Sequence, residues 1–239
     1  MALYTLRLRG QPKDAQSETA VSLKEVDIFG QEQLTEHFLC DINPEGQVPV
    51  LSCIGKSGNI PDSLKMTFYM ASKYPELMPV AHEKQIRQLL IDLHALNYFS
   101  LSFPGRMDVI QGIVDSIKTR LEDPTISNRY RKALEFKLSI VQKTKVDGLI
   151  PTEVTRMEQQ ARDLLASLDR MVGEEKTWIF SDKPTALDAH LVVFIARMTD
   201  VGRENIIPEG LRKYGARARQ NPDWTSMMEG RKTMVPKGN

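Results

Sequence analysis

The segment Gly46-Gln47-Val48-Pro49-Val50-Leu51 constrains the fold of this chain more than any other feature. Pro49 stands inside an otherwise apolar run of β type. Because proline has no backbone N–H to donate, it belongs at a sheet edge or at the start of a strand. We predict a cis bond between Val48 and Pro49, which leaves the backbone N–H and C=O of Val48 unpaired. An extended peptide can add to such an edge as one more strand.

Asp62 and Ser63 follow this segment and open a helical pattern. The free N–H groups at a helix start favour a carboxylate, and the Asp62 carboxylate suits an ammonium group. A peptide-docking edge, an anion site and a nearby carboxylate together suit glutathione. Each feature alone has a simpler explanation, because Gly-Gln-Val-Pro is also a tight turn into a strand and Asp-Ser is also an ordinary N-cap pair.

These residues resemble the glutathione-binding motifs of the cytosolic glutathione S-transferase superfamily. A second resemblance lies further on, where residues 181–190 read SDKPTALDAH and are similar to a signature of that family's helical domain. Thr185 and Asp188 have the spacing of a capping box and are expected to start a buried helix. The resemblance implies the glutathione transferase fold, an α/β N-terminal thioredoxin-like domain followed by an all-α C-terminal domain.

The hydrophobic pattern divides the chain in the same way. Strands are expected at 2–6, 21–28 and 50–53, helices at 33–40 and 62–74, and a glycine-containing turn at 55–58. Beyond the prolines near residue 78, helical spacing recurs at 83–99, 108–121, 126–144, 154–171 and 187–198, with smaller helices between 209 and 220. The expected domains are 1–78 for glutathione binding and 84–228 for the helices, with 229–239 as a mobile tail. The short gap between the first two strands leaves no room for the family's full first helix.

The composition is that of an ordinary globular protein, with 239 residues, 41% of them hydrophobic and 26% charged. A net charge of +1 argues against nucleic acid or an anionic membrane as the main partner. Neither a membrane-spanning run nor a leader pattern occurs, so we expect a cytoplasmic protein. The two cysteines, Cys40 and Cys53, do not have the spacing of metal ligands, and the four histidines do not cluster at ligand spacing. No metal site is expected.

The resemblance implies specific roles for residues of a glutathione site. Val48 holds the cysteinyl backbone of glutathione, and Pro49 sets its geometry. Asp62 and Ser63 match the acidic-serine pair that holds the γ-glutamyl group. Gln47 aligns with a position near the glycyl end. Glutathione is therefore the expected cosubstrate.

Catalysis in that family requires a group that activates the glutathione thiol. A cysteine-like thiol with a pKa of about 8.5 is only about 3% thiolate at pH 7, and a hydrogen-bond donor or a positive dipole raises that fraction. Thr5 aligns with the tyrosine of the tyrosine-type classes, and Tyr4 is its neighbour. Ser17 and Thr19 lie where the serine-type classes offer a donor. All four hydroxyls are candidates.

The resemblance also implies a homodimer and an apolar acceptor pocket between the domains. Tyr98, Phe99, Phe103 and Met107 are candidates to line this pocket, although residues of these types are also common in cores.

Three functions fit these features. The first is transfer of glutathione to a small electrophilic or hydrophobic metabolite. The second is trans/cis isomerisation of a polyene by reversible addition of the thiol. The third is a non-catalytic binding module. The chain most resembles fungal glutathione transferases of secondary metabolism. These include a trans/cis isomerase of pseurotin-type biosynthesis.

Overall fold

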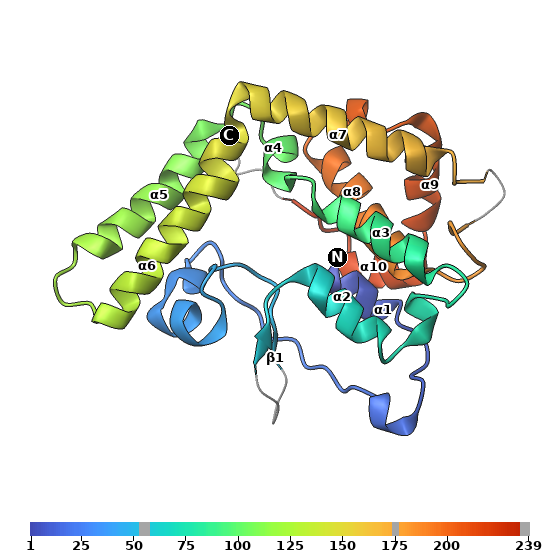
Figure 1. Cartoon of the computed structure of the whole chain (residues 1–239), viewed down its shortest axis with the longest axis horizontal. Helices are drawn as coiled ribbons and strands as arrows, with labels where there is room; N and C mark the ends of the chain where they lie inside the picture. Colours follow the sequence, from blue (N-terminus) through green and yellow to red (C-terminus); the bar gives the residue numbers. More distant parts are fainter. Residues whose placement is uncertain (53–57, 174–176, 235–239) are drawn as a thin grey trace.

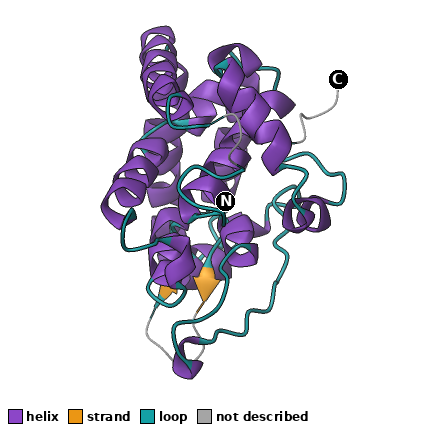
Figure 2. Cartoon of the chain, turned by 90° about the vertical axis from the view of Figure 1, so that its right-hand side faces the viewer, coloured by secondary structure: helices purple, strands orange, loops and turns teal. Residues whose placement is uncertain are grey.

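The computed structural model describes residues 1–52, 58–173 and 177–234. This part of the chain is mostly helical, and its small sheet lies near the bottom of the molecule (Figures 1 and 2). Cys53, the turn residues 55–57 and the end of the expected tail, 235–239, lie outside the described residues. None of the helices in the described ranges is long and apolar enough to cross a membrane.

The first expected strand, 2–6, is a helix, and the prediction for these residues was wrong. Helix α1 spans Ala2–Arg7 and packs against α8 (Ala186–Asp200) and α10 (Pro222–Met228). Tyr4 and Thr5 are both fully buried. Neighbouring residues lie on opposite faces of a strand but close together around a helix, so burying both favours the helix. Alanine, leucine and arginine in this segment are also good helix formers.

The expected sheet forms only in part. Strands β1 (Leu51–Ser52) and β2 (Asn59–Ile60) pair antiparallel. Residues 21–28 were expected as a strand, but the described structure has them outside the sheet. Leu23 is 67% exposed in this segment. An alternating pattern does not make a strand unless a neighbour takes up its hydrogen bonds.

Short and irregular elements make up the rest of the N-terminal part. They are the 3₁₀ helices η1 (Ala15–Ser17), η2 (Glu32–Leu34) and η4 (Pro75–Leu77) and the π-helix η3 (Phe38–Ile42), which replaces the helix expected at 33–40. Helix α2 (Ser63–Ala71) is regular, and its N-cap is Asp62. The Asp62 carboxylate accepts from the N–H of Lys65 at 2.7 Å, so the Asp-Ser pair starts a helix as predicted.

Beyond residue 82 every described element is helical. The elements are α3 (Glu83–His94), α4 (Tyr98–Ser102), α5 (Met107–Glu122), α6 (Asn128–Val141), η5 (Gln142–Val146), η6 (Asp147–Leu149), α7 (Pro151–Asp169), α8, η7 (Glu204–Ile206), α9 (Glu209–Ala218) and α10. The predicted helices are therefore confirmed, with small shifts at their ends. Helices α5 and α6 form a hairpin at the left of Figure 1, and α8 contacts α1, α3 and α9.

Two hydrophobic cores tie the N-terminal part to the helices. The larger core joins side chains of α1 and α2, including Tyr4 and Met70, to α3, α8 and α9. The smaller core packs Leu34 and Leu39, from the irregular segment before the sheet, against α5 and α6. The segments before and after the β1–β2 hairpin are thus both packed against the helical part.

Helix α8 begins in the predicted capping box. The buried Asp188 carboxylate accepts from the N–H and from the hydroxyl of Thr185, each at 2.7 Å. It also accepts from the N–H of Ile179 at 3.1 Å and from the hydroxyl of Tyr214 at 2.6 Å. These donors offset the cost of burying a charge.

We expect Asp188→Ala to lower the free energy of unfolding by about 3 kcal/mol or more, because the buried donors of Thr185, Ile179 and Tyr214 lose their acceptor. Urea unfolding measures the change. The matched control is Asp182→Ala, which removes an exposed carboxylate from the preceding loop and should change stability by less than about 0.5 kcal/mol. A loss below about 1 kcal/mol for Asp188→Ala would contradict the central role of this carboxylate.

Candidate functional site

The two segments expected to hold glutathione lie at the same end of the β1–β2 hairpin. The bond between Val48 and Pro49 is cis, as predicted. Pro49 and Asp62 each stand two residues outside the last pair of the hairpin, so its antiparallel register brings the two segments together. Val48 and Pro49 are exposed, and Asp62 and Ser63 are partly exposed. Both segments are open to a ligand from solvent.

A buried lysine supports the loop that leads to Val48. Lys137 of α6 is 3% exposed, and its ammonium group donates to the C=O of Glu45 at 2.5 Å and of Gly46 at 3.2 Å. Burial, together with the nearby charge of Lys145, lowers the pKa of Lys137 to about 8. Lys137 thus fixes the N-terminal loop to the helical part.

The same loop is held by its own residues. The side-chain amide of Asn43 donates to the C=O of Gln47 at 2.8 Å, while the residue Gln47 is itself exposed. Gly46 has a φ of 55°, and a Cβ there would lie 2.9 Å from the side chain of Leu39. Only glycine meets both requirements without strain.

A chain of hydrogen bonds runs from α2 into the helical part. The Thr67 hydroxyl donates to the C=O of Ser63 at 2.8 Å and lies 2.8 Å from Nε2 of His190. The Nδ1 of His190 lies 2.7 Å from Nε2 of His94. Because the Thr67 proton goes to Ser63, His190 donates through Nε2, and in the neutral ring Nδ1 then accepts from His94. This pattern requires His190 to be neutral.

The surroundings favour the neutral form of both rings. Burial lowers the pKa of His190 well below its ordinary value, and His94 and the Met1 amine act in the same direction. Burial also lowers the pKa of His94, against the attraction of the Asp62 carboxylate. Protonation at low pH therefore opposes folding.

A histidine with a lowered folded pKa contributes full stability above its unfolded pKa of about 6.5 and loses it as the pH falls below that value. We expect the free energy of unfolding to fall by up to about 1.4 kcal/mol per pH unit for each such histidine. Urea unfolding between about pH 5.5 and 7.5 measures this slope, and His190→Gln should make it shallower. The control is His37→Gln, whose side chain is 73% exposed. Equal slopes for the wild type and His190→Gln would rule out the buried pair as the source.

The candidate thiol activators are largely enclosed. Tyr4 and Thr5 are fully buried, and neither hydroxyl has a hydrogen-bond partner in the described part of the chain. The Tyr4 ring packs edge-on against Trp224 at 5.2 Å between centroids, and burial raises the pKa of Tyr4. Ser17 is also buried, and its N–H donates to the Asp14 carboxylate at 2.7 Å.

Thr19 is partly exposed, but its groups are already bonded. Its hydroxyl donates to the C=O of Ser17 at 3.1 Å, and its N–H donates to the hydroxyl of Tyr74 at 2.9 Å. None of the four candidates thus offers an exposed, unbonded hydroxyl in this conformation.

The residues expected to line an acceptor pocket have different surroundings. The Tyr98 ring packs edge-on against Phe194 of α8 at 5.3 Å, and its hydroxyl is buried without a partner among the described residues. The Phe103 ring lies 5.1 Å from that of Phe99. Met107 begins α5 and is 47% exposed. Tyr98 therefore belongs to the core beside α8, whereas Met107 lies at the surface.

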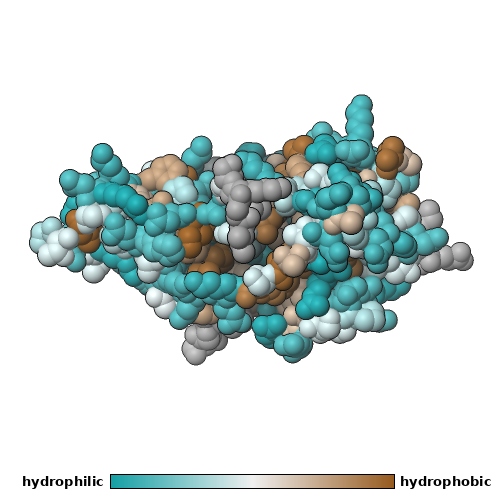
Figure 3. Space-filling model, turned by 90° about the horizontal axis from the view of Figure 1, so that it is seen from below, coloured by the Kyte–Doolittle hydropathy of each residue, from teal (hydrophilic) through white to brown (hydrophobic). Residues whose placement is uncertain are grey.

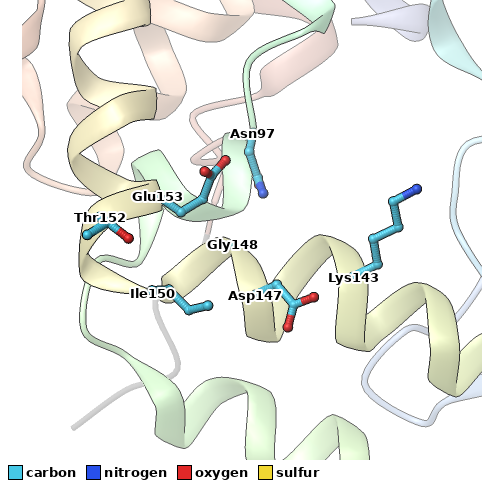
Figure 4. Close-up of a pocket in the computed structure, with 7 residues that line it drawn as sticks. All are labelled: Asn97, Lys143, Asp147, Gly148, Ile150, Thr152 and Glu153. Carbon is cyan, nitrogen blue, oxygen red and sulfur yellow. The ribbon is translucent and has the colours of Figure 1, made fainter.

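Neither of two measurable cavities is lined by these pocket residues. A cavity of about 270 Å³ lies where η6 meets α7, with Asn97 and Glu153 on one side and Asp147 on the helix opposite (Figure 4). Three of its polar side chains serve the fold, because Asn97 caps α4, Asp147 accepts from Gln142 and Glu153 pairs with Arg156. Its lining is mostly polar, whereas a typical small-molecule pocket is mostly apolar, so we do not assign the acceptor site to this cavity.

The second cavity, of about 230 Å³, separates α1 from the extended segment after it. Its walls are Leu3, Leu6, Arg7, Arg9, Val21 and Leu23. Across the described ranges, no cluster of three His, Cys, Asp or Glu side chains could hold a metal ion.

Three partly or fully buried cations were missed from the sequence, namely Lys137, Lys145 and Arg197. For two of them, apolar neighbours in the sequence indicate burial. Lys137 falls between Leu134 and Val141 on the apolar face of α6, and Arg197 directly follows the apolar run 191–196 of α8. Lys145 has no such signal.

Comparison with known proteins defines the fold. No protein-family model and no curated protein matches the sequence. A glutathione S-transferase domain-containing protein from Marinobacter aquaeolei VT8 matches with a TM-score of 0.54 and 18% identity, over 94% of this chain and 93% of that one. A glutathione transferase family member from Pseudomonas fluorescens pf-5, solved with two glutathione bound, gives 0.51 and 17%, over 94% and 86%. Maleyl pyruvate isomerase, a bacterial glutathione S-transferase of the zeta class, gives 0.53 and 14%, over 93% and 88%.

The chain has the glutathione transferase fold. The fold class expected from the sequence, a thioredoxin-like N-terminal domain followed by a helical domain, is thereby confirmed. This chain departs from the expected pattern in two ways. Helix α1 stands where the first strand was expected, and the sheet is one hairpin in the described residues.

Proposed function

We propose that this protein is a glutathione-dependent enzyme acting on a small electrophilic or conjugated metabolite. Residues 1–78 bind glutathione, and 84–228 bind the second substrate. The observation that carries the proposal is the meeting of the Val48–Pro49 edge and the Asp62–Ser63 helix start at one end of the hairpin. The edge supplies backbone pairing for a peptide, and the helix start supplies N–H groups for a carboxylate.

Each residue has a defined role in this proposal. The cysteinyl backbone of glutathione pairs with Val48, and Gln47 lies toward the glycyl end. The γ-glutamyl carboxylate accepts from the N–H and hydroxyl of Ser63. Asp62 uses one carboxylate oxygen to cap α2, which leaves the other for the γ-glutamyl ammonium group.

We expect Ser63→Ala to weaken glutathione binding about ten- to hundredfold, because a hydrogen bond to a charged group is worth roughly 1.5–3 kcal/mol. Calorimetry measures the dissociation constant. Ser72→Ala at the other end of α2 removes an exposed hydroxyl from the same helix and serves as the control. Unchanged affinity in Ser63→Ala would refute the assignment of the γ-glutamyl site.

The enclosed hydroxyls favour isomerisation as the second candidate function. In this reaction the glutathione thiolate adds to a conjugated alkene, a bond rotates, and elimination returns glutathione unchanged. Positioning of the two reactants supplies much of the rate enhancement, so a strongly lowered thiol pKa is not required. With Tyr4, Thr5 and Ser17 buried, strong activation of the thiol by any of them requires a rearrangement.

The resemblance to fungal transferases of secondary metabolism suggests conjugated polyketides or polyenes as candidate substrates. It also implies a homodimer that works in the cytoplasm. Light scattering of the purified protein measures the oligomeric state directly.

We expect weak turnover of a generic aryl halide. Tyr4→Phe should keep this rate within about twofold of the wild-type rate, because the buried Tyr4 hydroxyl does not reach a thiol. We also expect a stronger, glutathione-dependent change of a conjugated polyene. Both products and free glutathione are followed during turnover. Consumption of glutathione indicates transfer, and an isomerised product with glutathione unconsumed indicates isomerisation. If neither reaction depends on glutathione, the non-catalytic binding module is correct.

A further inference from the structure

We propose that Lys145 and Arg197 form a carboxylate-binding subsite, so that the second substrate is a conjugated or aromatic acid. The inference rests on the proposed glutathione-dependent function, which it narrows to a substrate class. It adds a carboxylate to the hydrophobic, electrophilic or conjugated substrate expected from the sequence.

The two cations flank the first turn of α4 from different elements. The ammonium group of Lys145, on η5, lies 5.2 Å from the centre of the Phe99 ring. The guanidinium of Arg197, on α8, lies 5.8 Å from the centre of the Tyr98 ring, and its Nε donates to the Ser102 hydroxyl at 2.8 Å. This bond holds the guanidinium in place, and its terminal nitrogens have no acceptor in the described part of the chain.

Neither cation has a carboxylate partner among the described residues. Burial lowers the pKa of Lys145 and of Arg197, and the charge of Arg197 further lowers that of Lys145. Like charges that are partly buried near one another destabilise the free protein unless an anion joins them. A bound carboxylate removes this penalty, and charges perturbed in this way are typical of functional sites.

The subsite adjoins the elements that support both glutathione segments. The charge of Lys145 helps to lower the pKa of Lys137, which donates to the backbone C=O of Gly46 shortly before Val48. Arg197 stands about two turns after His190 on α8, and His190 bonds to α2. Seen from below, the middle of the molecule is hollowed and shows hydrophobic residues within the hollow (Figure 3).

The chemistry of the pair favours a small planar acid. An arginine fork matches the two oxygens of a carboxylate, and an adjacent ammonium adds a second charge. The rings of Tyr98 and Phe99 suit a flat, conjugated body. The carboxylate can belong to the second substrate, as we propose, or to the glycyl end of glutathione, and the experiment separates these sources.

The experiment compares acids with their methyl esters in the full chain. The unreactive pair is 3-benzoylpropionic acid and its ester, whose binding is measured by calorimetry without glutathione. The reactive pair is trans-3-benzoylacrylic acid and its ester, whose kcat/KM is measured with glutathione. The variants are Arg197→Gln and Lys145→Gln, with Arg197→Lys as a milder change that keeps the charge. The matched control is Lys143→Gln, an exposed lysine on the same element.

We expect the wild type to favour each acid over its ester by about tenfold or more, the usual gain from a charge-assisted bond. Arg197→Gln and Lys145→Gln should abolish the preference and leave ester binding unchanged, Arg197→Lys should keep part of it, and Lys143→Gln should keep all of it. Thermal unfolding verifies that each variant is folded.

Equal binding of acid and ester by the wild type would overturn the proposal, as would a preference that survives in both glutamine variants. If these variants instead weaken glutathione binding and leave the acid preference intact, the cations serve the glycyl carboxylate and the proposal is wrong. A clear acid preference in binding, with no glutathione-dependent turnover of either reactive compound, would support the subsite and refute the proposed function.

Discussion

The buried carboxylate of Asp188 is the interaction on which the rest of the structure depends. It connects the loop before α8 through Ile179, the start of α8 through Thr185, and α9 through Tyr214. A carboxylate accepts these bonds more strongly than a neutral group of similar size. Because α8 is buried along most of its length and contacts α1, α3 and α9, fixing its start also fixes the positions of His190 and Arg197.

Both halves of the proposed glutathione site are therefore supported by the helical part. His190 and Thr67 join α8 to the first turn of α2, and Lys137 joins α6 to the loop before Val48. Each of these polar groups is buried and satisfied, so displacing either segment would leave a donor or acceptor unpaired in the core. The small sheet therefore does not need to hold the site by itself. This explains how the two segments can stay in place although the described residues form a sheet of only two strands.

Features with a local cause could be predicted from the sequence. The N-cap at Asp62, the capping box of α8 and the long helices each depend on residues within a few positions of one another, and all were predicted correctly. The strand predicted at 2–6 was wrong because a short apolar run fits a strand and a helix equally well. Burial of Tyr4 and Thr5 against α8 and α10 favours the helix. The segment 21–28 alternates as a strand does, but the described structure gives it no partner.

The proposed site could be predicted only in part, because some of its residues are distant from one another in the sequence. Its glutathione segments are short, contiguous and carry recognisable residues, whereas Lys145 and Arg197 reach the rings of α4 only when η5 and α8 pack against that helix. The net charge of +1 is a sum over the whole chain, so it does not show this local excess of positive charge. A nearly neutral protein is poorly suited to bind long polyanions. By contrast, two partly buried cations without a carboxylate partner in the described ranges are suited to one small anion. Two positive charges among 32 basic and 31 acidic side chains are not visible in the net charge of the protein.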